Sequence, residues 1–142
     1  MLEPIEVVLL KQKIEPLAVD HPLLEAPKQS RVIARQLLLQ GRYSATVYTY
    51  AVSLLMLDQL PTEVRRQLDI EPGGIGRILL NSQLENRREV LWYGYEHLTD
   101  LPEDVSLLTG TDFISRTYRI IAGGIPIMLI NEKFPIKCMS RL

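Results

Sequence analysis

The chain has 142 residues, of which 46% are hydrophobic and 23% are charged, and its formal net charge is −1. These values are typical of a single globular domain covering residues 1–142, and they argue against a basic nucleic-acid-binding surface. No run reaches the roughly 18 apolar residues of a membrane span, and the first ten residues lack the pattern of a signal peptide, so we expect a soluble cytoplasmic protein.

Three strands are predicted in the N-terminal part of the chain. Residues 5–14 are rich in β-branched and apolar side chains, which favour a strand. The prolines within residues 16–27 then exclude a long regular element. Residues 31–40 and 44–53 are the next two predicted strands, and the short turn between them indicates a β-hairpin.

Three further strands are predicted in the C-terminal part. They cover residues 87–96, 113–121 and 125–134, and Gly123 and Gly124 form the turn between the last two. The connections are short and no βαβ alternation occurs. We therefore expect an α+β fold, with a single antiparallel sheet of about six strands and short flanking helices on one side.

Two short helices are expected between these strands. One begins at Pro61 or Thr62 and ends near Leu68. The other covers residues 100–108, where Asp100 and Glu103 have the spacing of a capping box.

Two charged residues are predicted to point toward the apolar side of the sheet. Because side chains alternate along a strand, Arg35 shares a face with Ile33 and Leu37, and Glu132 shares a face with Ile130. Buried charges are unfavourable unless they are paired. The two residues therefore form a structural ion pair, reach solvent at the sheet edge, or line a pocket in which Arg35 binds a carboxylate and Glu132 binds a hydroxyl or transfers a proton.

Other candidate residues give weaker signals. Arg116 shares a face with Tyr118 and is also predicted to point inward, where an ion pair is the expected role. His21, His97 and the single cysteine, Cys138, do not have the spacing of metal ligands, so no metal site is expected.

A glycine-rich segment covers residues 73–77, with the sequence GGIGR. Its spacing fits neither a dinucleotide-binding fingerprint nor a P-loop. Glycines permit close approach of the backbone to a ligand, but from the segment alone a simple turn after the helix that ends near Leu68 is the favoured interpretation.

Taken in order, these features resemble the chorismate pyruvate-lyase family. The matching motifs are Leu23-Leu24, Ser30-Arg31, the Arg35 segment, Leu60-Pro61, Gly74-Ile75-Gly76-Arg77, Ser115-Arg116, Gly124-Ile125-Pro126 and Asn131-Glu132-Lys133-Phe134-Pro135. The resemblance implies a sheet over an internal ligand cavity. It also implies a carbon–oxygen lyase that converts chorismate into 4-hydroxybenzoate and pyruvate, without metal or cofactor, for quinone or related aromatic biosynthesis.

The resemblance also implies roles for individual residues. Arg35 matches the arginine that holds the ring carboxylate, and Ile75 matches the position whose backbone amide contacts the ligand. Gly76 and Arg77 belong to the same binding segment, and Arg77 is one candidate for binding the second carboxylate of chorismate.

Arg116 is the other candidate for the second carboxylate. Glu132 matches the glutamate at the oxygen-bearing end of the ring, although an ungapped count places that glutamate at Asn131. Strand parity and the need for a carboxylate favour Glu132, with Arg35 and Glu132 as the catalytic pair.

Family enzymes carry helices before the first strand, whereas here the first predicted strand begins close to Met1. We therefore expect a short family member. The alternative is a non-catalytic domain of the same fold that binds an aromatic carboxylate, as in the effector domains of some transcription regulators. The expected partner in either case is a small molecule, and the sequence leaves the oligomeric state open.

Overall fold

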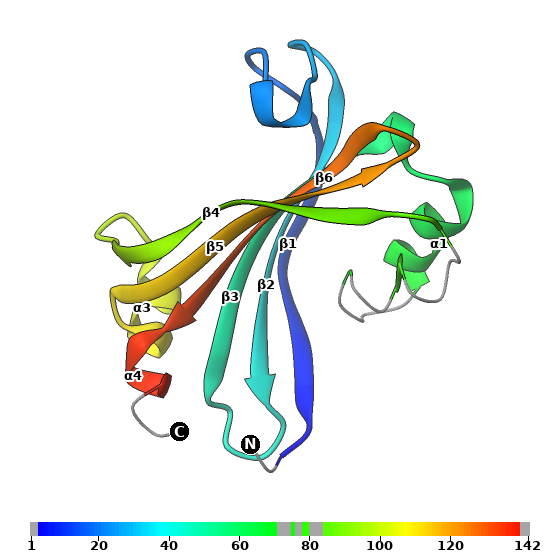
Figure 1. Ribbon diagram of the computed structural model, residues 1–142. Coiled ribbons are helices and arrows are strands. Elements are labelled where there is room, and N and C mark those ends of the chain that lie inside the picture. Colours follow the sequence, from blue (N-terminus) through cyan, green and yellow to red (C-terminus); the bar gives the residue numbers. More distant parts are fainter. Residues whose placement is uncertain (1–2, 71–74, 76–77, 80–83, 140–142) are drawn as a thin grey trace.

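A computed structural model of the chain describes residues 3–70, 75, 78–79 and 84–139. The fold is α+β, as predicted, with one six-stranded antiparallel sheet in the order β1-β2-β3-β6-β5-β4 (Figure 1). The strands are β1 (Ile5–Pro16), β2 (Arg31–Gly41), β3 (Val47–Met56), β4 (Arg87–His97), β5 (Asp112–Ala122) and β6 (Ile125–Pro135). Each predicted strand is confirmed, with differences only at its ends.

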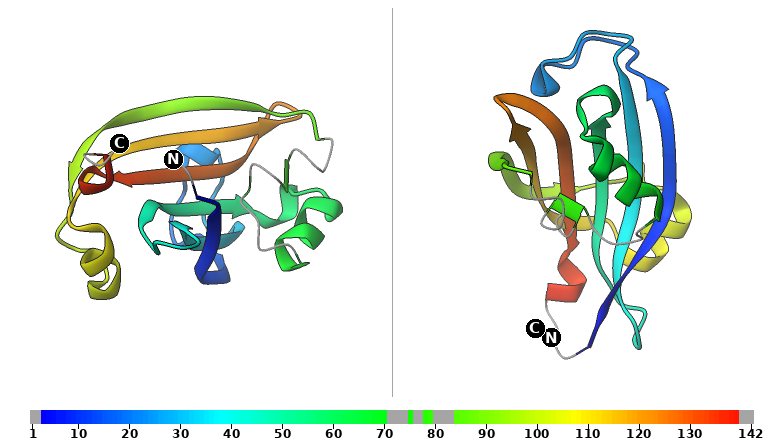
Figure 2. Two further views of the ribbon diagram at one scale, coloured as in Figure 1. Left: turned by 90° about the horizontal axis from the view of Figure 1, so that it is seen from below. Right: turned by 90° about the vertical axis from the view of Figure 1, so that its right-hand side faces the viewer.

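The sheet is built from a hairpin of β2 and β3 extended by β1, and a hairpin of β5 and β6 extended by β4. These halves meet where β3 pairs with β6, with Ser53 opposite Ile130. Figures 1 and 2 show a strong twist across the sheet, so that β4 crosses the direction of β2 and β3. The twist follows the right-handed preference of L-residue strands.

The helical elements are η1 (Pro22–Leu24), η2 (Leu57–Gln59), α1 (Thr62–Ile70), α3 (Glu103–Thr109) and α4 (Ile136–Met139), and Ile75, Ile78 and Leu79 are also helical. The helix predicted from residue 61 or 62 is confirmed as α1. The predicted capping box at Asp100 is wrong, because the N-cap of α3 is Pro102 and no side chain caps it. A proline disfavours helical backbone at the residue before it, which prevents a start at Asp100.

The helices cover both faces of the sheet, so the expectation that they lie on one side is also wrong. Val64 of α1 packs in a cluster with Ile33 of β2. Val105 of α3 packs with Leu38 and Tyr50, whose side chains lie on the opposite face by strand alternation. The alternation pattern could not show this, because both faces of β2 and β3 carry apolar residues.

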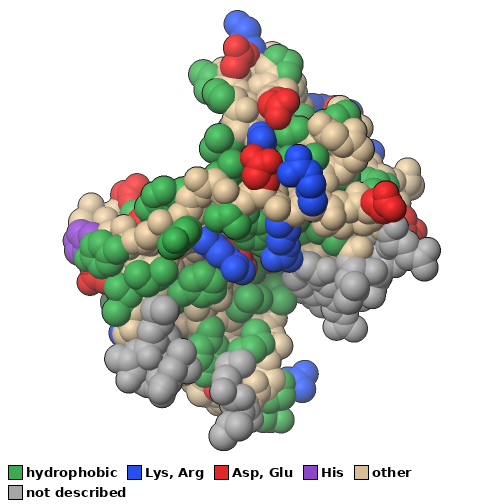
Figure 3. Space-filling model, in the orientation of Figure 1, with side chains coloured by type: hydrophobic (Ala, Val, Ile, Leu, Met, Phe, Trp, Pro, Cys, Tyr) green, Lys and Arg blue, Asp and Glu red, His purple; other side chains and the backbone are tan. Residues whose placement is uncertain are grey.

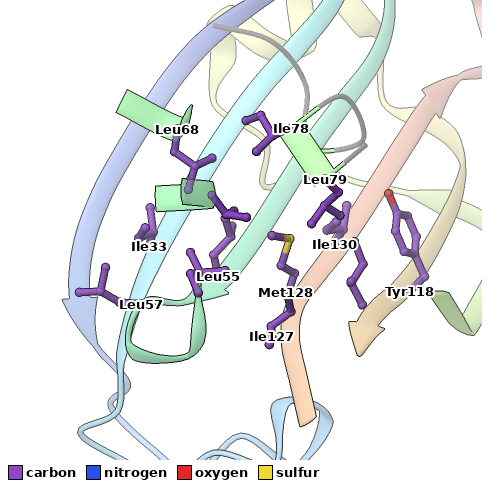
Figure 4. Packing of buried hydrophobic residues seen from close by; sticks show 13 residues of the cluster. Ile33, Leu55, Leu57, Leu68, Ile78, Leu79, Tyr118, Ile127, Met128 and Ile130 are labelled. Atoms are coloured by element: carbon purple, nitrogen blue, oxygen red, sulfur yellow. The ribbon is translucent and has the colours of Figure 1, made fainter. Parts of the chain in front are cut away.

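The main core cluster lies between the sheet and α1 (Figure 4). Leu55 and Met128 are fully buried at its centre, and Tyr118 lies at one end, beyond Ile130. Ile120 of the same cluster is also fully buried. Burial of each such aliphatic side chain contributes about 1.5–3 kcal/mol to folding. This cluster therefore anchors the face of the sheet on which the candidate site lies. Within the described residues, no helix has the length and apolar character required to cross a membrane.

Candidate functional site

A pocket of about 270 Å³ lies on the same face of the sheet as the main core cluster. Strands from both halves of the sheet contribute to it, together with Ile75. Its apolar wall consists of Leu37, Leu39, Ala51, Ile75 and Ile130, and its polar groups come from Ser53, Arg88, Arg116, Tyr118 and Glu132. This combination of apolar walls and a few polar groups is typical of a site for a small organic molecule.

Arg35 lies behind the wall of this pocket, on the face predicted from strand alternation. The Arg35 side chain is only 2% exposed. Arg35 pairs with Ser53 on β3, and it lies two residues before Leu37 on the same face of β2; both Ser53 and Leu37 line the pocket. Arg35 itself is not among the lining residues. Its Nε and Nη1 atoms are buried and have no hydrogen-bond partner among the described residues.

The burial of Arg35 lowers the pKa of its guanidinium through desolvation. Arginine is so basic that the group nevertheless stays charged. A buried, charged and unpaired donor is unfavourable in the ligand-free protein. Both unpaired nitrogens carry N–H donors of the kind that binds a carboxylate.

Glu132 does not pair with Arg35, which answers the question left open by the sequence. Its Oε1 atom accepts a hydrogen bond from Nε of Arg116 at 2.6 Å. The ion pair expected for Arg116 is thus confirmed, with its partner on the neighbouring strand β6. The Glu132 side chain is only 16% exposed and lines the pocket.

Asn131, the alternative position for the family's glutamate, lies on the other face of β6. Its Nδ2 atom donates to Oγ1 of Thr117 at 2.9 Å. Of the two candidates, only Glu132 contributes to the pocket wall.

Arg88 and Tyr118 belong to the pocket but were not singled out from the sequence. The guanidinium carbon of Arg88 lies 5.1 Å from the centre of the Tyr118 ring, and that of Arg116 lies 5.4 Å from it. Burial, followed by the charge of Glu132, raises the pKa of the Tyr118 phenol. Figure 3 shows basic side chains set among hydrophobic ones near the place where β4 and β5 cross the molecule.

Arg88 was hard to identify because β4 is an edge strand with a bulge between Val90 and Trp92. The sequence contains two adjacent arginines, Arg87 and Arg88, and alternation alone cannot tell which one points toward the core. The pairing of Arg88 with Ile120, a residue of the main core cluster, settles its direction.

The glycine-rich segment is described only at Ile75, which is helical, half-buried and part of the pocket wall. Gly76 and Arg77 lie outside the described residues. Among the described residues, no group of three or more His, Cys, Asp and Glu side chains is placed to hold a metal ion.

Comparison with known families matches the whole chain, residues 1–142, to the model described as "Chorismate pyruvate-lyase Rv2949c-like". A protein of Mycobacterium leprae named chorismate pyruvate-lyase is 33% identical over 144 residues, covering 93% of this chain and 63% of the relative. The protein of the same name from Mycobacterium tuberculosis H37Rv is 30% identical over 137 residues, covering 90% of this chain and 66% of the relative. The chain thus spans about two thirds of the length of these curated relatives.

Solved structures with the same fold include a transcriptional regulator of the GntR family from Bacillus cereus, with a TM-score of 0.71 at 10% identity. That alignment covers 94% of this chain and 92% of the regulator chain. The gene product SA0254 from Staphylococcus aureus has a TM-score of 0.70 at 16% identity, with 94% of this chain and 85% of the other covered. At these identities the likeness shows the fold alone.

Proposed function

Because the chain belongs to the Rv2949c-like chorismate pyruvate-lyase family, we propose that it is a carbon–oxygen lyase that converts chorismate into 4-hydroxybenzoate and pyruvate. The relatives named chorismate pyruvate-lyase support this activity. The observation that carries the proposal is the buried guanidinium of Arg35, unpaired among the described residues, beside a pocket of about 270 Å³.

The charges around the pocket suit the substrate. Among the residues that the structure describes, Arg35, Arg88 and Arg116 provide three positive charges and Glu132 provides one negative charge, which leaves two positive charges. Chorismate carries two carboxylates, so it would neutralise this excess. The apolar wall fits one carbocyclic ring, and the pocket, at about 270 Å³, is slightly smaller than the roughly 300–1,000 Å³ of typical small-molecule sites.

The reaction breaks the bond between a ring carbon and the ether oxygen. The oxygen and the bonding electrons leave with the three-carbon group, which takes up a proton on carbon to become pyruvate. The ring loses a proton and becomes aromatic. In our proposal Arg35 fixes the ring carboxylate and the apolar wall holds the ring, so that orientation supplies much of the rate.

Glu132 is assigned to the oxygen-bearing end of the ring. Its carboxylate already accepts a hydrogen bond from Arg116, so we propose that it accepts a further hydrogen bond from the ring hydroxyl. General-acid assistance to the departing oxygen is the alternative role, and removal of such a group lowers turnover by about 10²–10⁴-fold.

The first prediction concerns turnover and the role of Glu132. Purified protein incubated with chorismate should release pyruvate and 4-hydroxybenzoate in equal amounts, and EDTA treatment should not reduce the rate. We expect Glu132→Gln to lower kcat by less than about 10²-fold, since an amide can still hydrogen-bond but cannot transfer a proton. A larger loss, with unchanged affinity for 4-hydroxybenzoate, would assign proton transfer to Glu132.

Arg35→Met is the background control for this assay, because chorismate also decomposes without an enzyme. If the protein binds 4-hydroxybenzoate but releases no more pyruvate than this control, it is a non-catalytic binding domain and not a lyase. If the protein neither binds 4-hydroxybenzoate nor releases pyruvate, both the lyase function and the binding function are wrong.

A further inference from the structure

We infer that Arg88 receives the second carboxylate of the ligand, so that the pocket selects ring compounds with two carboxylates over those with one. The inference rests on the proposed function for the identity of the substrate. It adds to that function the residue that recognises the second acidic group.

The strand order places Arg35 and Arg88 on opposite sides of the pocket. Arg35 lies on β2, near one edge of the sheet, and Arg88 lies on β4, at the other edge. Ser53 of β3, Ile130 of β6 and Tyr118 of β5 line the pocket on the strands between them. A ligand whose first carboxylate reaches Arg35 would therefore present its far end to Arg88.

The three arginines described at the pocket, two in its wall and Arg35 behind it, differ in burial and in whether a carboxylate already balances their charge. Arg116 is committed to Glu132 at 2.6 Å. Arg35 is deeply buried, whereas Arg88 is exposed on the pocket wall. Among the described residues no carboxylate lies within ion-pairing distance of Arg88. Of the three arginines described at the pocket, Arg88 is thus the exposed one whose charge has no carboxylate partner.

Tyr118 positions the guanidinium of Arg88 without using its hydrogen-bond donors. The contact at 5.1 Å is between the guanidinium carbon and the ring centre, and it is a cation–π interaction. The Arg88 side chain donates no hydrogen bond to another described residue, so its N–H groups can bind a carboxylate in a bidentate manner. The ring itself is held by burial, since Tyr118 is only 6% exposed.

The test compares two ligands that differ by a carboxymethoxy group, which carries the second carboxylate. The probes are 4-hydroxybenzoate and 3-(carboxymethoxy)-4-hydroxybenzoate, and their affinities are measured by calorimetry. Wild type should bind the dicarboxylate at least about 10-fold more tightly, as expected for one charge-assisted pair. Arg88→Gln should lose this preference and keep its affinity for 4-hydroxybenzoate within about 2-fold.

Arg87→Gln is the matched control. It removes the same charge one residue away, but Arg87 points to the other face of β4 and contacts Glu89 at 3.4 Å. This variant should keep the preference for the dicarboxylate. Tyr118→Phe should keep it as well, because the ring is retained.

In the binding assay, three results would overturn the inference: no preference for the dicarboxylate in wild type, equal losses of this preference in Arg87→Gln and Arg88→Gln, or an equal loss of affinity for both probes in Arg88→Gln. The lyase assignment is judged separately. A dicarboxylate preference that depends on Arg88, without pyruvate release, would remove the lyase activity and leave the inference intact. If Arg88→Gln turns over chorismate with an unchanged KM, the lyase activity stands and the inference about Arg88 falls.

Discussion

Arg35 destabilises the ligand-free fold and at the same time provides a cation that can bind an anionic ligand. Its guanidinium is charged, 2% exposed and lacks partners for Nε and Nη1 among the described residues. Placing such a group in the interior is unfavourable, and an anion bound at the site would compensate for it. Residues of this kind are commonly retained for function at the expense of stability.

Arg35→Met should therefore stabilise the ligand-free protein and disable the site. Methionine fills a similar volume without a charge, and we expect a gain of about 1–3 kcal/mol in the free energy of unfolding. Affinity for 4-hydroxybenzoate should fall by at least about 100-fold, since a buried carboxylate would lose its partner. Thermal unfolding with and without 4-hydroxybenzoate measures both effects. A lower melting temperature for the ligand-free variant would instead give Arg35 a structural role.

At the scale of elements, Glu3 ties the start of β1 to the turn between β2 and β3. Its carboxylate accepts hydrogen bonds from the Ser44 hydroxyl at 2.6 Å, from the backbone N–H groups of Ser44 and Tyr43 at 3.0 Å, and from the Tyr48 hydroxyl at 3.1 Å. These bonds, led by that of the Ser44 hydroxyl, lower the pKa of Glu3 from 4.5 to about 2. One acidic side chain thus ties the start of β1 to the turn between β2 and β3 and to β3 itself.

This pKa shift predicts a specific dependence of stability on pH. A carboxyl group with a depressed pKa in the folded state stabilises the fold above its unfolded pKa of 4.5, and the contribution disappears as the pH falls toward about 2. Wild type should exceed Glu3→Gln in stability above pH 4.5, and the difference should vanish near pH 2. Urea unfolding of both proteins across this range tests the prediction. A difference that does not change with pH would contradict it.

At the scale of the whole molecule, the pocket joins the two halves of the sheet. Leu37, Leu39, Ala51 and Ser53 come from β2 and β3, whereas the remaining strand residues come from β4, β5 and β6. The halves are also joined by the pairing of β3 with β6 and by the main core cluster, which contains residues of both halves. A ligand in the pocket therefore contacts both sides of this central pairing.

A bound ligand should accordingly stabilise the entire fold. At a concentration 100 times its Kd, 4-hydroxybenzoate should add about 2.7 kcal/mol to the free energy of unfolding and raise Tm by roughly 5–10 °C. Hydrogen exchange should slow in β2 and β3 as well as in β5 and β6. Protection confined to one half of the sheet would place the ligand elsewhere.

Local patterns in the sequence determined the six strands, helix α1 and the inward direction of Arg35 and Glu132, because propensity and alternation depend on near neighbours. Only the tertiary structure decided that Glu132 pairs with Arg116, that Arg88 reaches the pocket, and that the helices cover both faces of the sheet. These features depend on strand order, a bulge in an edge strand and the packing of distant segments. Such long-range relations are not encoded in the periodicity of any single segment.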